Sequence, residues 1–175
     1  MQNCELVDLA VLEAESSFVR GKLIAYLDDL MSLGVDGFRI DAGKHVPVAD
    51  LEAIFAGLDG TPVIYDEIIE GEPGEVSPLE YVGTGDVTEF RYGDVVGNAF
   101  RDANLANMNN LAGQMLLASG HAIAFVDNHD TQRNGRARLT YKDGGRRRGH
   151  LGDRRQPRAV TGTDCSLILN DSWRN

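Results

Sequence analysis

Helical and strand-like patterns alternate along this chain, and that alternation limits the possible folds more than any other feature. Ser17 opens a helical pattern that Gly34 closes. Residues 37–41 then alternate strictly between apolar and polar side chains, as a strand does. Further helices and strands follow at similar spacing, which predicts a parallel sheet of α/β type.

The remaining elements are expected in the same order. A stretch rich in Gly, Pro and Glu over residues 70–86 is expected to form a long loop. The expected strands are residues 37–41, 63–65 (ending near 67), 87–91 and 121–127, and the expected helices are residues 17–34, about 49–58 and about 94–117.

Charge and composition exclude several classes of function. The formal net charge is −10, which disfavours nucleic acid as the main partner. No apolar run approaches the ~20 residues of a membrane-spanning helix, so no membrane partner is expected. No signal peptide is visible at the start of the chain. Cys4 and Cys165 lie far apart without a CxxC spacing, which disfavours a thiolate metal site.

Three acidic residues, Asp41, Glu67 and Asp130, follow expected strands. In (β/α) barrels, the active site forms at the carboxyl ends of the strands. A single acid at such a place is more often a helix cap or a salt-bridge partner. Three acids in equivalent positions, two of them near His45 and His129, favour a catalytic cluster.

The spacing of Arg39 and Asp41 adds chemical detail. Residues two apart in a strand share a face, so these two side chains project together. An arginine beside a carboxylate lowers the pKa of that carboxylate and keeps it ionised, as a nucleophile requires. The alternative is a purely structural ion pair, and the two roles are compatible.

These motifs resemble the alpha-amylase family. GFRIDAGKHV (residues 37–46), YDEII (65–69) and FVDNHDTQR (125–133) are similar to that family's segments at the fourth, fifth and seventh barrel strands. VTEFRYGDVVG (87–97) resembles the sixth strand of the bacterial and animal branch. The resemblance covers roughly residues 2–143. It implies an α/β fold, a partial (β/α)8 TIM barrel with about half of the catalytic barrel.

The resemblance also implies an activity, the retaining endo-hydrolysis of α-1,4-glucosidic bonds in starch or maltooligosaccharides. Asp41 would be the nucleophile and Glu67 the general acid and base, with their carboxyl groups ~5–5.5 Å apart. Asp130 would bind sugar hydroxyls and help to distort the ring. The expected substrate-binding residues are Arg39, Lys44, His45 and His129.

Ions are implied as well. The family holds a structural calcium partly through the backbone carbonyl that matches His45. Val11 stands where the family usually has a calcium-binding aspartate, and valine offers no oxygen ligand, although Asp8 or Glu13 could substitute. In the chloride-dependent branch, residues matching Arg39 and Asn128 bind chloride, which makes chloride a second possible ion here.

The composition changes after Asp143. Residues 1–143 carry 24 acidic and 10 basic side chains, whereas residues 144–175 carry 3 acidic and 7 basic ones. We therefore divide the chain into a partial catalytic barrel (1–143) and an arginine-rich tail (144–175). Our hypothesis is that the tail comes from a shifted reading frame or a vector, and that Met1 is an internal start. The resemblance implies a secreted, monomeric parent enzyme, and we expect the fragment alone to be inactive.

Two other functions stay open on the residues alone. A metal-dependent barrel hydrolase would use Asp41, His45, His129 and Asp130 as ligands, but the chain has only four histidines and no HxH pair. A non-catalytic piece that binds glucan would keep the motifs without the scaffold that orders them.

Overall fold

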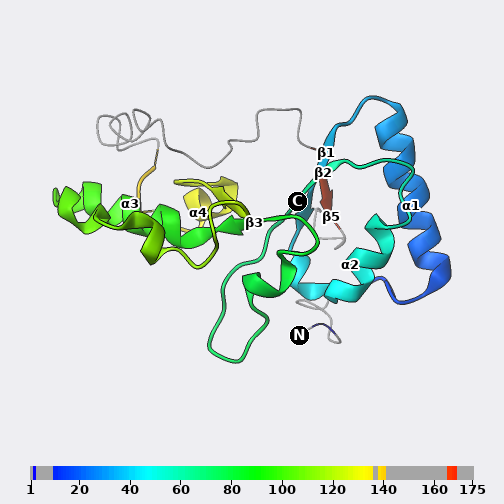
Figure 1. The fold of residues 1–175 in the computed structure, drawn as a ribbon, viewed down its shortest axis with the longest axis horizontal. Helices are drawn as coiled ribbons and strands as arrows, with labels where there is room; N and C mark the ends of the chain where they lie inside the picture. The colour runs from blue at the N-terminus through cyan, green and yellow to red at the C-terminus, as the bar shows by residue number, and fades with distance from the viewer. Residues whose placement is uncertain (1, 3–9, 136–137, 141–164, 169–175) are drawn as a thin grey trace. The chain divides into compact units, whose positions relative to one another are not determined.

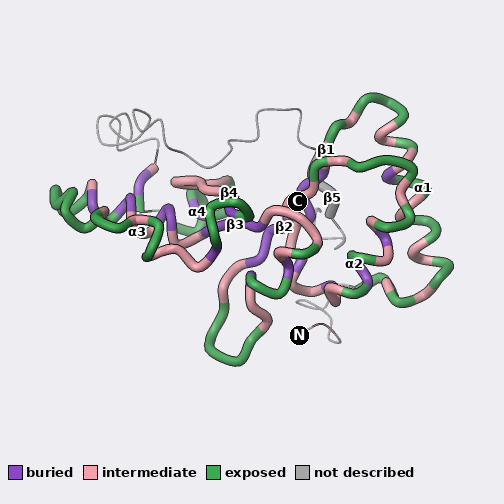
Figure 2. Tube along the Cα trace, viewed as in Figure 1, coloured by how far each residue is buried: buried purple, intermediate pink, exposed green. Residues whose placement is uncertain are grey.

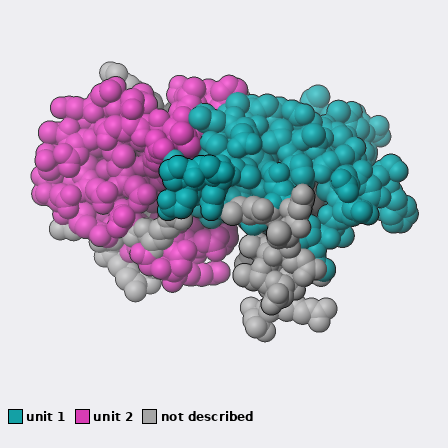
Figure 3. Space-filling model, turned by 90° about the horizontal axis from the view of Figure 1, so that it is seen from below, with its two compact units in different colours: residues 1–87, 161–175 teal, residues 88–160 magenta. Residues whose placement is uncertain are grey.

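The computed structural model describes residues 2, 10–135, 138–140 and 165–168. The chain divides into two compact units (Figure 3), one of residues 1–87 with 161–175, the other of residues 88–160.

The first unit holds the expected helix–strand alternation (Figure 1). Its elements are α1 (Ser17–Ser32), β1 (Gly37–Asp41), the 3-10 helix η1 (Gly43–His45), α2 (Val48–Phe55), β2 (Val63–Asp66), the 3-10 helix η2 (Pro78–Tyr81), the start of β3 (Asp86–Glu89) and β5 (Cys165–Ile168).

β1, β2 and β3 are parallel and follow one another in space as they do along the chain. In the β1–β2 pair Ile40 lies opposite Asp66, and in the β2–β3 pair Asp66 lies opposite Val87. A doubly wound sheet reverses its strand order at a switch point, whereas a (β/α) barrel adds each strand beside the last. The order β1, β2, β3 is therefore that of a barrel segment.

The core of the unit forms between these strands and the two helices. Phe38 and Ile40 of β1 are 1% and 0% exposed, and Leu27 of α1 and Leu51 of α2 are fully buried. The helices α1 and α2 contact each other and lie on the same side of β1 and β2 (Figure 1). Figure 2 shows buried residues both in the strands and in α2. As the alternation predicts, the apolar residues of β1 pack into the core.

One strand lies in the tail. β5 pairs in parallel with β1, with Arg39 opposite Ser166. Residues 141–164 and 169–175 lie outside the described residues, so the proposed origin of the tail stays a prediction.

The second unit contains the end of β3 and the elements that follow it. These are α3 (Phe90–Arg101), the 3-10 helices η3 (Leu105–Met108) and η4 (Leu111–Gln114), β4 (Ala122–Ala124) and α4 (His129–Arg133). β4 is the neighbour of β3 in the strand order.

The helix expected over residues 94–117 differs from the one observed. It starts earlier, at Phe90, because the Glu89 side chain accepts a hydrogen bond from the Arg91 backbone N–H at 3.0 Å and ends the strand there. It also ends earlier, at Arg101. Ala103 and Asn110 adopt left-handed φ values of 53° and 56°, which a continuous α-helix does not allow.

Among the described residues, no helix combines the length and the apolar character that crossing a membrane requires.

Candidate active site

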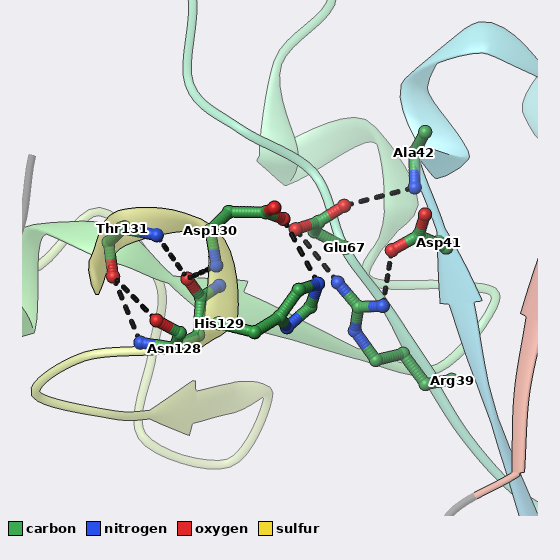
Figure 4. A network of polar contacts seen from close by, with 8 residues as sticks. All are labelled: Arg39, Asp41, Ala42, Glu67, Asn128, His129, Asp130 and Thr131. Carbon is green, nitrogen blue, oxygen red and sulfur yellow. Dashed lines mark hydrogen bonds and ion pairs between the residues drawn. The ribbon is translucent and has the colours of Figure 1, made fainter. Parts of the chain in front are cut away.

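Arg39 lies between two of the predicted catalytic carboxylates (Figure 4). Its Nη1 forms an ion pair with Asp41 Oδ1, as the spacing within β1 predicts. Its Nη2 lies 2.8 Å from Glu67 Oε1, a close ion pair whose geometry is not that of a directed hydrogen bond. The three side chains are only 6–20% exposed, so solvent screens these charges weakly. One guanidinium thus joins the ends of two adjacent parallel strands.

Glu67 is held by the backbone of β1 as well as by Arg39. Its own N–H donates to the Ile40 carbonyl at 2.8 Å, which extends the β1–β2 pairing by one residue. The Ala42 N–H donates to Glu67 Oε2 at 3.1 Å. Glu67 is 5% exposed. Its carboxylate therefore has a defined position at the carboxyl end of β2.

The turn after β1 makes this contact possible. Ala42 adopts a left-handed φ of 49°, and the next N–H, that of Gly43, donates to the Glu67 carbonyl at 3.1 Å. A Cβ at Gly43 would lie 3.0 Å from Ile68 Cδ1, a closer approach than side chains usually allow. The turn accordingly presents two successive N–H groups to Glu67.

Lys44 and His45 follow in η1, where the sequence places two of the predicted sugar-binding residues. Burial, followed by the positive charge of Lys44, lowers the pKa of His45. Its Nδ1 is buried and has no hydrogen-bond partner among the described residues. The imidazole is therefore neutral at neutral pH, and its role toward a sugar stays a prediction.

In the second unit, the predicted residues Asn128, His129 and Asp130 lie at the start of α4 (Figure 4). Asn128 Oδ1 accepts hydrogen bonds from the N–H groups of Asp130 (3.1 Å) and Thr131 (2.8 Å), and Thr131 Oγ1 accepts from the Asn128 N–H at 2.9 Å. This reciprocal capping box fixes the first turn of the helix. His129 Nε2 and Asp130 Oδ2 lie 3.2 Å apart on side chains 42% and 54% exposed. Both are open to a solvent-borne ligand.

The structure brings Arg39, Asp41 and Glu67 together in one unit, and Asn128, His129 and Asp130 together in the other.

Two buried acids were not predicted from the sequence. Asp66, in β2, is 0% exposed. Glu89 is 2% exposed, and its Oε2 accepts from the N–H groups of residues 116 and 117, both at 2.8 Å. A charged residue beside an apolar run was the available signal in each case.

The cavity beside His45 has Val11 at the position where the resemblance implies an aspartate ligand for calcium. Val11, Glu13 and His45 line a cavity of about 260 Å³, but valine supplies no oxygen ligand. Asp50, which also lines it, is ion-paired with Arg20. No group of three or more His, Cys, Asp or Glu that could hold a metal occurs in the described part of the chain. Asp8 lies outside the described residues.

The parallel strands β1, β2 and β3 in barrel order, with Asp41 and Glu67 at the carboxyl ends of β1 and β2, define the class as a segment of a (β/α) barrel. No family model matches the chain. Individual proteins do match it. It is 47% identical over 157 residues to an alpha-amylase of Tribolium castaneum and 49% identical over 148 residues to an alpha-amylase of Streptomyces violaceus, in each case covering 82% of this chain.

Solved structures give the same result. Alpha-amylase I from Eisenia fetida matches with a TM-score of 0.76 and 34% identity over 83% of this chain. A variant of that enzyme in complex with maltohexaose matches with a TM-score of 0.75 and 35% identity. The matched part of this chain is thus a segment of the alpha-amylase family's catalytic barrel, and the resemblance and the fold predicted from the sequence are confirmed. The chain spans only 26–33% of the length of these relatives.

Proposed function

We propose that the protein carries the central catalytic segment of an alpha-amylase, which hydrolyses α-1,4-glucosidic bonds in starch or maltooligosaccharides with retention of configuration. The observation that supports this most is the juxtaposition of two largely buried carboxyl groups, Asp41 and Glu67, which Arg39 holds together at the ends of neighbouring strands. The relative in complex with maltohexaose supports a glucan as the substrate class.

The proposed mechanism uses two carboxylates in two steps. Asp41 attacks the anomeric carbon while Glu67 donates a proton to the leaving glycosidic oxygen, which gives a covalent glycosyl-enzyme. Glu67 then takes a proton from water, and the water oxygen attacks from the face that the leaving oxygen left, opposite Asp41, which breaks the bond to Asp41 and restores the original configuration. Arg39 stabilises the ionised form of Asp41, and the Ala42 N–H fixes one oxygen of Glu67.

The other predicted residues have binding roles in this proposal. Asp130 and His129, both open to solvent, hold sugar hydroxyls. Lys44 and His45 contact a neighbouring glucose. No step of this mechanism uses calcium or chloride, and calcium binding near His45 stays a prediction. Chloride binding by Arg39 and Asn128 stays a prediction.

A chimera tests the proposal. Residues 10–140 of this chain would replace the matched segment of the Streptomyces violaceus alpha-amylase, which supplies the rest of a complete enzyme. We expect release of reducing sugar from soluble starch, with the α-anomer formed first, as ¹H NMR of the products would show. Glu67→Gln should lower the rate by ~10²–10⁴-fold, because it removes the ionisable proton but keeps the shape of the side chain.

Glu72→Gln is the matched control, since Glu72 is exposed in the loop before η2. Melting temperatures of all proteins show whether they are folded. A folded chimera in which Glu67→Gln and Glu72→Gln both keep the parent rate would contradict the proposal. A folded chimera that binds maltohexaose without hydrolysing it would instead favour the non-catalytic, glucan-binding alternative.

A further inference from the structure

Asp66, the residue before Glu67, is an acid in the middle of the sheet. It ends β2 and is 0% exposed. Its partners in the neighbouring strands are both apolar, Ile40 of β1 and Val87 of β3. An ionised carboxylate in such surroundings costs several kcal/mol unless it is compensated, so its protonation state needs an explanation.

The contacts of Thr84 indicate that state. Thr84 Oγ1 lies 2.6 Å from Asp66 Oδ2 and also 2.6 Å from the Tyr81 carbonyl oxygen. A hydroxyl has a single hydrogen to donate. If Asp66 were ionised, one of these two short contacts would join two acceptors with no hydrogen between them. If Asp66 is protonated, its Oδ2–H donates to Thr84 Oγ1, and the Thr84 hydroxyl donates to the Tyr81 carbonyl.

The electrostatic surroundings agree with the protonated form. Burial raises the pKa of Asp66 to about 7. A Thr84 hydroxyl that donated its hydrogen to the carboxylate would oppose this effect. Burial also raises the pKa of Tyr81 to about 12, so its hydroxyl stays a donor to the Val46 carbonyl at 2.7 Å. The titratable or charged groups on the elements packed against Asp66, besides Tyr81 and Glu80 of η2, are Arg39 and Asp41 of β1, Lys44 and His45 of η1, Asp86 and Glu89 of β3, and Glu67 beside it.

The Asp66 carboxyl lies against the turn that holds Glu67. A Cβ at Gly43 would be 3.6 Å from Asp66 Oδ1, so the carboxyl packs directly on this glycine. The Gly43 N–H donates to the Glu67 carbonyl, and the Ala42 N–H donates to the Glu67 carboxylate. A change of charge on Asp66 therefore changes the electrostatic environment of the turn at residues 42–43, whose N–H groups position Glu67.

We propose that Asp66 is a protonated, neutral positioning residue for Glu67, which joins the loop after η2 to the end of β2 through Thr84. The positioning role rests on the proposed function, because it matters for catalysis only if Glu67 is the acid. The protonation of Asp66 and the hydrogen-bond direction stand independently of that function.

The sign of the pH dependence follows. The folded state keeps a proton that Asp66 in the unfolded chain releases near its ordinary pKa of 3.8. The contribution of Asp66 to stability is therefore greatest below about pH 4. It falls as the pH rises toward 7 and is constant above that pH.

Carboxyl ¹³C NMR of the full chain between pH 4 and 9 tests the proposal. We expect the Asp66 Cγ signal to titrate near pH 7. Thr84→Val removes the acceptor of the Asp66 proton, so it should move this inflection to lower pH. An Asp66 inflection below pH 5, or a shift to higher pH in Thr84→Val, would overturn the proposal, since the hydroxyl would then be donating to an ionised carboxylate.

Melting temperatures of two variants provide a second measurement. Asp66→Asn keeps a donor toward Thr84 and cannot ionise, so it should match the parent at pH 4 and melt at a higher temperature at pH 8. Asp66→Ala should melt lower at both pH values. Asp59→Asn, at an exposed position, should show no such difference between pH 4 and pH 8. If Asp66→Asn lost as much as Asp66→Ala at both pH values, the neutral form would not be the native one.

The positioning role has its own readout. The Glu67 Cδ signal should show an inflection at the titration of Asp66, and this inflection should disappear in Asp66→Asn. A purely structural Asp66 would leave the Glu67 signal unaffected, which would refute the positioning role. None of these measurements uses hydrolysis. An inactive chimera would therefore count against the proposed function alone.

Discussion

Arg39 balances charge for both carboxylates at the ends of β1 and β2. Its side chain is 10% exposed, and its two terminal nitrogens each contact a different acid. Lysine, with a single charged nitrogen, could not make both contacts in this geometry. Without Arg39, the Asp41 and Glu67 carboxylates would be poorly solvated and would lose their shared cation, which would destabilise the folded state.

Replacing Arg39 should therefore destabilise the fold. We expect Arg39→Leu to lower the free energy of unfolding by about 3 kcal/mol, the scale for removing one partner of a buried ion pair. Urea denaturation of the full chain measures this. Arg133→Leu is the control, because Arg133 is exposed on α4 and should change stability by less than about 1 kcal/mol. Equal effects of the two substitutions would show that the Arg39 contacts do not stabilise the strand ends.

At the scale of elements, glycines let the backbone of β2 approach its neighbours closely. Gly37 opens β1, and a Cβ there would lie 2.6 Å from the Val63 carbonyl oxygen. A Cβ at Gly85, just before β3, would lie 2.6 Å from the Ile64 carbonyl oxygen. Both distances are too short for a side chain next to rigid backbone. The sheet that positions Arg39, Asp41 and Glu67 therefore depends on small residues at the starts of its strands.

Two glycine substitutions should act with opposite signs. Gly37→Ala should lower the free energy of unfolding by about 1–3 kcal/mol, because the new methyl group would push β1 and β2 apart. Gly21→Ala, in α1 with open space around it, should raise it by about 0.5–1 kcal/mol through a lower backbone entropy of the unfolded chain. Urea denaturation of the two variants measures both effects. A stabilising Gly37→Ala would show that β1 and β2 do not approach as closely as described.

At the scale of the whole molecule, the matched segment makes up only 26–33% of its relatives. Catalysis by a barrel needs the groups of several strands held in register, and a misplacement of about 1 Å can cost ~10²-fold in rate. In the solved relatives, the matched segment is about a third of a longer chain.

The isolated chain should accordingly release at least about 100-fold less reducing sugar from soluble starch than the chimera that contains the same residues. The measurement compares the two proteins at equal molar concentration, with the Glu67→Gln chimera as the background. A rate for the isolated chain within about tenfold of the chimera would show that residues outside the matched segment contribute little to ordering the site.

Local patterns were enough to predict much of this protein. The strand from Gly37 to Asp41 follows from alternation, and the shared face of Arg39 and Asp41 follows from the two-residue period of a strand. The motifs around Asp41, Glu67 and Asp130 were enough to recognise the alpha-amylase family, which the comparisons confirm. The roles of these residues stay predictions.

Contacts between distant residues were decided by the tertiary structure alone. The Arg39–Glu67 ion pair and the Thr84–Asp66 contact join residues far apart in sequence, and no local period encodes them. The α3 helix begins after Glu89, whose buried side chain caps it, and ends before Ala103, whose backbone is left-handed. These two local features outweigh the helix propensity of the flanking residues. The sequence alone determined which side chains share a strand face, since that depends on backbone period. Only the packed sheet decided which acid is buried and neutral, since that depends on which neighbours exclude water.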